Sequence, residues 1–568
     1  MKRLKTAIIA FMAIVPAWAQ MDNVVEVENT YTPQVKDANK INVVPEKKTV
    51  TVSRRKVDYA VSSLPLSSGH VFQPMSATQG DPVVTEAKKG FFTAGGGSLG
   101  NLLIRGAIGL DLTSKDRLNI DLGLKGFNGN TTEDINSAFG DEKWKSRFYT
   151  SRGAVSYSHS LSPQSALYAR ASFSSQVFNY MNEYLDASTA AFTDKQHNSI
   201  GALSAGITPY SLGRFSVGAE ASYMFFKQKY ATTLDDANEE NIFMLKSDLK
   251  YEISRNNSLA LDLGIRGTQY GMKVDAPLHD DFKNTFGFCF APRYEFSGDK
   301  VGLTVGLRGY ASSGYENSFN MAPDISVVYH YSDKMDIYAH VTGGEVYNDF
   351  RRFSSLTPYW TFLAPMSGAG PTPLQHIDQF DQLRALLGVR TKLIAGLYAD
   401  LSVGYDVSKN RTEIALYGNG ASAASIFTAD GNRLHANVHI RYDYADKLSV
   451  DLKNTFNSWT KIEVPGEYEK QNVLSRPVID LDWNISWRML SALRLGVDYQ
   501  YQSFRSSESA VLPERPATSN LNAELSYSFP VRLTLYAKAM NILNHKHHCY
   551  YGVPALGTSF MAGAAITF

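Results

Sequence analysis

The chain has 568 residues, of which 44% are hydrophobic and 20% are charged, and its formal net charge at pH 7 is +1. A near-neutral protein without a block of basic residues offers nucleic acid little to hold, so we exclude a nucleic-acid partner. The two cysteines, Cys289 and Cys549, are too few for a disulfide framework. Because Cys289 falls within a predicted strand and Cys549 in a predicted surface loop, we expect no disulfide between them.

The first residues have the three parts of a secretory signal peptide. Three basic side chains precede an apolar run over residues 6–17, which ends in the small-x-small sequence Ala17-Trp18-Ala19. We therefore predict that residues 1–19 direct export and are then removed, so that Gln20 begins the mature chain. Because residue 20 is not a cysteine, we expect no lipid anchor.

Residues 20–88 are expected to form an extended N-terminal segment, in the periplasm or in the lumen of a barrel. The segment is rich in Val, Lys and Pro and lacks the pattern of a compact domain. Two interpretations stay open: a lead without fixed structure, or a segment that enters the lumen or contacts a periplasmic partner. The residues expected to contact such a partner are Val24, Val25, Val27, Tyr31 and Pro33.

The remainder of the chain alternates apolar and polar side chains over long runs. In the run 433–444, for example, Leu434 and Val438 have one parity, whereas His435 and Asp443 have the other. Because side chains alternate across a strand, such a run has one apolar face and one charged face. For a single strand, this pattern is also typical of a soluble antiparallel sheet with one wet face.

Strand length and aromatic placement favour a membrane barrel over the soluble sheet. The runs extend over roughly 10–15 residues, and a tilted strand needs about 9–11 residues to cross the hydrocarbon layer. Aromatic side chains also recur at one depth on the apolar face, just before the tight turns, as expected for a girdle at the headgroup level. Examples are Tyr329, Tyr331, Tyr444, Trp483 and Trp487.

Ten tight turns punctuate this part of the chain, and longer connections rich in Gly, Asn and Asp lie between them. The turns are at 114–116, 162–164, 211–213, 255–257, 298–300, 332–334, 395–397, 445–447, 490–492 and 529–531. They join twenty strands; a further strand is predicted over 558–568, and an even number then requires a first strand at 90–94. We therefore predict an all-β fold for residues 89–568, a transmembrane antiparallel up-and-down β-barrel of about 22 strands with both ends in the periplasm.

The longest predicted outer connection runs from about residue 347 to residue 380. It contains a cluster of basic and aromatic side chains, Arg351, Arg352, Tyr359, Trp360 and Phe362. Such a loop either folds inward, where it constricts the pore and its rings pack together, or presents its rings to a sugar or an apolar ligand. We favour constriction, and both roles stay open for these five residues.

The sequence indicates neither catalysis nor a cofactor. It contains no His-Glu-x-x-His pair, and we recognise no catalytic constellation, so we predict a protein that is not an enzyme and needs no cofactor. The run from His545 to Cys549 has imidazole and thiol groups at close spacing. Adjacent residues in a loop rarely converge on one ion, however, and we expect no metal site there.

The last hairpin of the chain has a specific pattern. Residues 535–544 read Leu-Tyr-Ala-Lys-Ala-Met-Asn-Ile-Leu-Asn, a loop with Tyr550, Tyr551 and Gly552 follows, and the chain ends in Phe568. This pattern resembles the end of the TonB-dependent receptors. The resemblance implies an outer-membrane barrel of about 22 strands that this hairpin closes. Three residues of one parity resemble the C-terminal signal read by the barrel-assembly machinery, namely Phe560, Ile566 and Phe568.

The resemblance has one departure, which concerns the plug. Receptors of that family carry a globular plug inside the barrel, whereas residues 20–88 offer room for a much shorter segment. We therefore expect a short form that lacks a full plug domain. The apolar start of the segment, Val24-Val25-Glu26-Val27, looks like a TonB-binding box.

We thus expect an integral outer-membrane β-barrel that passes or takes up a solute by permeation along a charge-lined lumen. The expected partners are the outer-membrane lipid, the barrel-assembly machinery, and a periplasmic or TonB-type protein that contacts the N-terminal segment. The alternative is a structural or assembly barrel, which anchors periplasmic or surface partners through that segment and its loops. Both functions place the exported chain in the outer membrane of a Gram-negative cell.

Overall fold

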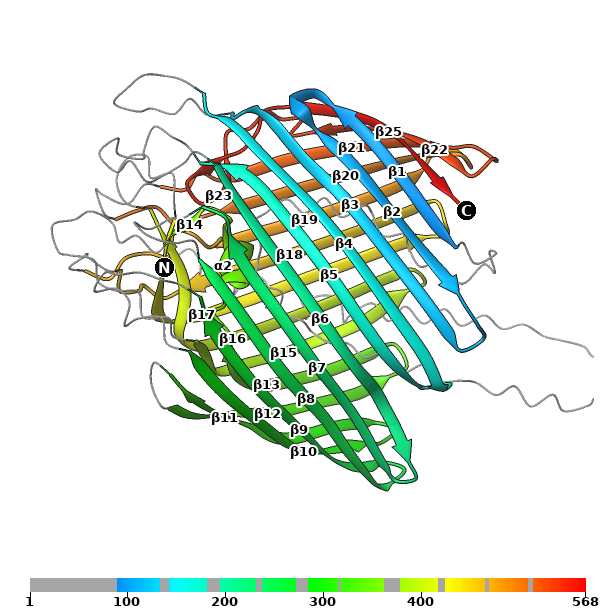
Figure 1. The fold of residues 1–568 in the computed structure, drawn as a ribbon, viewed down its shortest axis with the longest axis vertical. Helices are drawn as coiled ribbons and strands as arrows, with labels where there is room; N and C mark the ends of the chain where they lie inside the picture. Colours follow the sequence, from blue (N-terminus) through cyan, green and yellow to red (C-terminus); the bar gives the residue numbers. More distant parts are fainter. Residues whose placement is uncertain are drawn as a thin grey trace, which may run out of the picture. The chain divides into compact units, whose positions relative to one another are not determined.

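The computed structural model describes residues 89–132, 143–180, 195–230, 238–271, 284–314, 318–361, 378–416, 424–464, 469–508 and 514–568. In these ranges, 22 strands form one closed antiparallel barrel (Figure 1). Each of these strands pairs with its neighbour along the chain, and the first pairs with the last. The predicted all-β up-and-down barrel is therefore confirmed.

The strands have the following bounds. The first half of the barrel contains β1 Gly90–Gly97, β2 Leu102–Asp111, β3 Asp116–Asn130, β4 Lys145–Ser162, β5 Ser165–Asn179, β6 Lys195–Leu212, β7 Phe215–Gln228, β8 Glu239–Ser254, β9 Asn257–Tyr270, β10 Thr285–Ser297 and β11 Val301–Ser313. The second half contains β12 Ser318–Ser332, β13 Met335–Val346, β15 Gln379–Ile394, β16 Leu397–Ala415, β17 Ala424–Tyr444, β18 Leu448–Trp459, β19 Ile479–Arg488, β20 Leu493–Ser503, β21 Thr518–Ser528, β22 Leu533–Met540 and β25 Ser559–Thr567.

A few short elements lie outside the ring of strands. They are η2 Ser98–Gly100, α2 Phe350–Leu356, β14 Trp360–Thr361, β23 His548–Tyr550 and β24 Val553–Pro554. β23 and β24 pair with each other, whereas β14 adds to the outer end of β17 in a parallel orientation. No helix in the described ranges is long and apolar enough to cross a membrane.

The first and last strands close the barrel. Their register runs from Phe91 opposite Thr567 to Gly97 opposite Met561. The terminal residue extends this seam, because the C-terminal carboxylate of Phe568 accepts hydrogen bonds from Lys89 N at 2.7 Å and from Gly90 N at 3.0 Å. The first strand near Gly90, which we predicted because a closed barrel needs an even number of strands, is therefore present.

All ten predicted tight turns lie between the strands that they were expected to join. For example, Pro163 and Gln164 connect β4 to β5, and residues 445–447 connect β17 to β18. The tight turns and the C-terminus lie at one end of the barrel (Figure 1). The longer connections lie at the other end, which we call the outer mouth, because barrels of this kind have short turns on the periplasmic side.

The two parities of each strand have the predicted orientation. On β17, Leu434 faces outward and is 51% exposed, whereas His435 faces the lumen and is 8% exposed. Tyr331, Tyr444 and Trp487 are also exposed on the outer face, close to the tight turns. A closed ring with an apolar outer belt and aromatic side chains at its edge is a membrane-spanning barrel.

Ion pairs cover much of the inner face. Lys250 and Glu295 are 2.7 Å apart on β8 and β10, and Arg105 and Asp121 are 3.2 Å apart on β2 and β3. The three largest clusters of buried apolar side chains, in contrast, lie at the outer mouth. The tertiary packing that is not part of the strand ladder is therefore concentrated where the long connections meet.

Candidate functional site

Residues 347–361 leave the barrel wall after β13, and we call them the mouth segment. They contain the helix α2 and the short strand β14. Asp349 caps the helix, because its carboxylate accepts a hydrogen bond from Arg352 N at 2.7 Å. A helix of seven residues is not stable by itself in water, so its position depends on what it packs against.

Polar and charged side chains on the inner wall hold the start of the mouth segment. The Glu240 carboxyl group on β8 is buried and accepts a hydrogen bond from Phe350 N at 3.0 Å. Arg266 on β9 lies 3.6 Å from Asp349 and 3.8 Å from Asp378, on either side of the connection. A buried charge that loses its partner is costly, and these contacts therefore tie the segment to the wall.

Trp360 is the centre of one aromatic cluster in the mouth. Its side chain is fully buried, and its ring centroid lies 5.3 Å from that of Phe350 and 6.0 Å from that of Phe226 on β7. The indole Nε1 donates a hydrogen bond to Ser354 Oγ at 2.8 Å, so the polar end of the ring is also satisfied. Ile426 on β17 belongs to the same cluster.

Tyr359 is buried in a second cluster, which belongs to other connections. Its ring centroid lies 5.1 Å from that of Phe178 at the end of β5 and 6.0 Å from that of Trp144 before β4. The ring of Tyr550, in the connection that precedes the last strand, is 6.1 Å away. Two adjacent residues of the mouth segment thus pack against different parts of the rim.

The mouth segment bridges nearly opposite walls of the barrel. Trp360 packs on Phe226 of β7, while β14 pairs with the start of β17, where Trp360 is opposite Ala424. Eight strands of the ring lie between β7 and β17, out of 22. Because the side chain of Phe226 faces inward, the segment that covers it lies within the ring of strands. The segment therefore occupies part of the outer mouth.

A network of buried ions lies beside the mouth segment. Glu413 on β16 is 1% exposed and contacts Arg411 at 2.5 Å and Arg476 at 3.0 Å. In α2, Arg352 donates a hydrogen bond from Nη2 to Gln379 Oε1 at 2.9 Å. Burial, with a contribution from Arg476, lowers the pKa of Arg352 to about 10, so this side chain still carries its charge at neutral pH.

Sequence comparisons assign no relative to this chain. No protein-family model matches it, and no curated protein sequence matches it. Any assignment therefore depends on the three-dimensional fold.

Solved structures include barrels of the same design. The ferric enterobactin receptor PfeA of Pseudomonas aeruginosa has a TM-score of 0.61 at 12% identity, over 84% of this chain and 80% of the receptor. The siderophore receptor PirA of Acinetobacter baumannii has a TM-score of 0.63 at 10% identity, over 86% and 81%. The ferripyoverdine receptor of the P. aeruginosa outer membrane has a TM-score of 0.58 at 12% identity, over 85% and 72%.

The fold is that of the TonB-dependent receptor barrels. The strand number and the closure of the ring agree with the resemblance that the last hairpin indicated. At identities of 10–12% the likeness concerns the fold, and it transfers no ligand from these receptors to this chain.

The receptor-type barrel brings together some of the residues that the sequence singled out. Tyr359 and Trp360 are buried in the two aromatic clusters, and Arg352 lies at the edge of the ion network. Arg351 is exposed, and its Nη1 lies 3.1 Å from Met224 Sδ on β7. Phe362 lies outside the described residues, as do Val24, Val25, Val27, Tyr31 and Pro33.

Sequence reasoning missed the wall residues that receive the mouth segment. Phe178 and Phe226 are aromatic side chains at inward-facing positions near the outer ends of β5 and β7. Glu240 is also inward-facing, but its partner is a backbone N–H that is 110 residues away in sequence. A signal for the two phenylalanines was present, because an aromatic residue on the polar parity interrupts the alternation.

One short sequence in the barrel has the form Gly-x-Ser-x-Gly, which is also the form of the nucleophile turn in some hydrolases. It spans Gly96 to Gly100, where β1 passes into η2. The Ser98 hydroxyl accepts a hydrogen bond from Phe560 N at 2.8 Å and lies 3.4 Å from Phe560 O, so it ties η2 to the last strand. Among the described residues, no group of three or more His, Cys, Asp or Glu side chains could hold a metal ion.

Proposed function

We propose that this protein carries a solute across the outer membrane, and that the mouth segment restricts the outer entrance of its lumen. The observation that supports this proposal is the bridge made by Tyr359 and Trp360, which joins strands and connections from several sides of the rim. A segment buried within the ring reduces the open cross-section, while the ion-paired inner wall provides a polar path below it. This role requires permeation and no catalytic step.

The named ligands of similar barrels support a role in uptake. One of these structures is the ferric enterobactin receptor in complex with enterobactin, and another is a receptor bound to ferripyoverdine. These ligands belong to the named receptors, and the shared fold extends them to the present chain only as an analogy. We propose uptake of an external solute for the present chain on the same basis.

Conductance of the purified mature protein in planar bilayers tests the restriction. In the variant, residues 349–377 are replaced by a short Gly/Ser linker, and we expect a severalfold larger single-channel conductance. A matched control replaces residues 133–142 of another outer connection and leaves the mouth segment intact. If the variant is folded, as heat-modifiable gel mobility would report, and still conducts as the intact protein does, the restriction proposal is wrong.

We propose that the N-terminal segment contacts a periplasmic, TonB-type partner through Val24, Val25, Val27, Tyr31 and Pro33. The apolar sequence Val24-Val25-Glu26-Val27 supports this proposal. Deleting residues 22–82 should abolish co-purification of the partner and leave the barrel in the membrane. If the deletion abolishes co-purification of a partner, and neither the intact nor the shortened protein conducts ions, the transport proposal fails and a structural or assembly barrel is the better interpretation.

We also propose that Phe560, Ile566 and Phe568 are read by the barrel-assembly machinery. All three side chains face outward on the closing strand and are exposed, which leaves them available during insertion. Replacing Phe568 with Ala should lower the amount of folded barrel in the outer membrane. An unchanged amount at equal expression would show that the terminal ring has no such role.

A further inference from the structure

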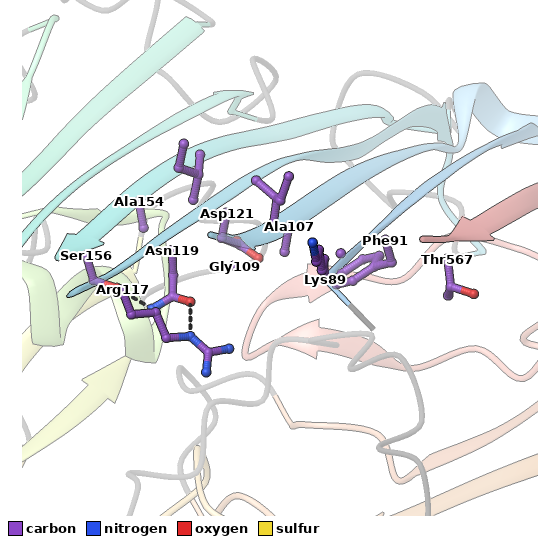
Figure 2. Close-up of a pocket in the computed structure, with 13 residues that line it drawn as sticks. Lys89, Phe91, Ala107, Gly109, Arg117, Asn119, Asp121, Ala154, Ser156 and Thr567 are labelled. Atoms are coloured by element: carbon purple, nitrogen blue, oxygen red, sulfur yellow. Dashed lines mark hydrogen bonds between the residues drawn. The ribbon is translucent and has the colours of Figure 1, made fainter. Parts of the chain in front are cut away.

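A hollow lies in the inner wall at the end with the tight turns, far along the strands from the mouth segment. Its volume is about 350 Å³, and β1 to β4 supply most of its lining, together with Lys89 and Thr567 (Figure 2). A volume of this order suits a small organic molecule or one part of a larger one. The hollow is therefore large enough to hold a ligand group.

Small side chains create the hollow. Ala107, Gly109, Ala154 and Ser156 occupy neighbouring inward-facing positions on β2 and β4, on either side of β3. Elsewhere the lumen face carries long charged side chains, such as Lys250 on β8 and Glu295 on β10. A run of short side chains thus leaves space beside the wall and an apolar floor.

The charge that remains at the hollow is positive. Asp121, the carboxylate in its lining, is already shared by Arg105 and Arg152, each at 3.2 Å. Arg117 donates a hydrogen bond from Nε to Asn119 Oδ1 at 3.2 Å, and its nearest carboxylate partner, Asp111, is 3.9 Å away.

The Arg117 side chain is also accessible, since it is 60% exposed. Lys89 is exposed as well and lies in the same lining (Figure 2). An anionic group in the hollow would therefore meet two cations, Arg117 and Lys89. The C-terminal carboxylate of Phe568 lies near Lys89, but the backbone N–H groups of Lys89 and Gly90 hold it, at 2.7 Å and 3.0 Å.

Phe91 adds an aromatic surface to the same space. It is labelled beside Lys89 in Figure 2, and Ala107 and Ala154 continue the apolar lining. The Arg105 guanidinium lies 5.3 Å from the Phe91 ring centroid, which holds that ring in place on the wall. The hollow thus combines an apolar floor with cationic groups at its edge.

We propose that this hollow binds a small organic anion, with its carboxylate at Arg117 and Lys89 and its apolar part against Phe91 and the small side chains. The position, on the inner wall near the periplasmic end, makes it a binding station on the route of the solute. The role as a binding station rests on the proposed function of the protein in transport. Binding of the anion itself does not require a conducting lumen.

Binding of benzoate to the purified mature protein in detergent tests the proposal, with saturation-transfer NMR or calorimetry at low ionic strength as the readout. We expect weak, saturable binding of benzoate. Acetate, which lacks the apolar part, and benzyl alcohol, which lacks the charge, should each bind about fivefold more weakly or not at all.

Three variants locate the site. Arg117→Ser removes the cation and Ala154→Phe fills the hollow, and each should weaken benzoate binding at least about fivefold. Arg390→Ser is the control. Arg390 is a lumen-facing arginine on β15, its guanidinium lies 5.5 Å from the Tyr338 ring, and β15 pairs with none of the strands that line the hollow. Its benzoate binding should equal that of the unchanged protein.

Equal binding in all four proteins, or no binding to any of them, would overturn the proposal. Heat-modifiable gel mobility checks that each variant is folded, so that a misfolded variant is not counted as support. Because the readout is equilibrium binding, this result is independent of the conductance measurement on the mouth segment. A negative result here therefore leaves the proposed restriction intact, and a negative conductance result leaves the binding site intact.

Discussion

The buried Glu413 at the outer mouth keeps its charge partners close, because it is removed from water. Glu413 is 1% exposed, yet Arg411 and Arg476 both contact its carboxylate, and Ser475 Oγ donates a hydrogen bond to it at 3.2 Å. Desolvating such ions is expensive, and the expense is offset when all of them are paired. Removing one member of the network should therefore lower the free energy of unfolding more than removing one partner of an exposed ion pair does.

Glu413→Gln tests the importance of this carboxylate. The substitution keeps the shape of the side chain but leaves the buried guanidinium of Arg411 and the partly buried one of Arg476 without their counter-charge. We expect a loss of about 3–5 kcal/mol in the free energy of unfolding. Denaturant unfolding of the purified barrel in detergent measures it. Glu463→Gln is the control: Glu463 is an exposed partner of Lys470 at 3.3 Å, and its replacement should change stability by less than about 1 kcal/mol.

The ionisation of Cys549 gives a second test at the residue scale. Burial raises the pKa of this thiol to about 11, and its Sγ donates a hydrogen bond to Val553 O at 3.3 Å, which also favours the protonated form. Because the thiolate is the reactive species, alkylation by iodoacetamide at pH 8 should be about 100-fold slower than in the denatured protein. Mass spectrometry of the peptide measures the rate. The rate should still rise between pH 9 and pH 10, and a plateau there would contradict the raised pKa.

At the scale of elements, the mouth segment depends on contacts made far from it in sequence. α2 has seven residues and one capping carboxylate, so local interactions alone cannot hold it. Phe350, Phe353 and Trp360 supply the apolar contacts that hold it against β7 and β17. The segment should therefore detach when its central ring is removed, while the barrel below it stays folded.

Trp360→Ala tests that dependence. Truncating a buried Trp typically costs about 3–5 kcal/mol, and here the loss should appear as local opening of the segment. Trypsin should then cut after Arg351 or Arg352 at least tenfold faster than in the unchanged protein, as gel electrophoresis of the fragments would record. Trp483→Ala serves as the control, because Trp483 faces outward on β19 and is 36% exposed. Equal cleavage rates in the two variants would mean that Trp360 does not hold the segment.

At the scale of the whole molecule, one seam decides whether the ring of strands is closed. Seven residue pairs join β1 to β25, from Phe91 opposite Thr567 to Gly97 opposite Met561. The seam tolerates no bulk at its start: a Cβ at Gly90 would lie 2.6 Å from Ala107 O and 2.8 Å from the Phe568 ring. An unclosed sheet would leave unpaired backbone groups in lipid, so closure determines the stability of the whole barrel.

Gly90→Val is therefore expected to impair closure. The variant should lose most of its heat-modifiable, folded form in outer-membrane preparations, because the clash involves backbone as well as a side chain. Gly267→Ala is the matched control, since a Cβ at Gly267 meets nothing within 4 Å. A folded fraction of Gly90→Val equal to that of the control would show that the seam can adjust at this point.

Several features of the barrel could be read from the chain because lipid imposes a local rule on every strand. Leu434 faces outward and His435 inward as their parity predicted, and the ten turns lie between the expected strands. Residues 90–94 were predicted to begin the barrel from the even strand number alone, and β1 starts at Gly90. The inward Phe178 and Phe226, however, depart from the alternation, and their packing partners are in other connections of the chain.

By itself, then, the sequence determined the fold class, the face of each strand that meets lipid, and the size of the ring. Those properties follow from a two-residue period and from turn chemistry, which act between near neighbours in the chain. The tertiary structure alone decided that Tyr359 packs on Phe178 and Tyr550, and that small side chains on β2 and β4 leave a hollow beside Arg117. Such contacts join residues that closure of the ring brings together, and no local pattern records which distant side chains will meet.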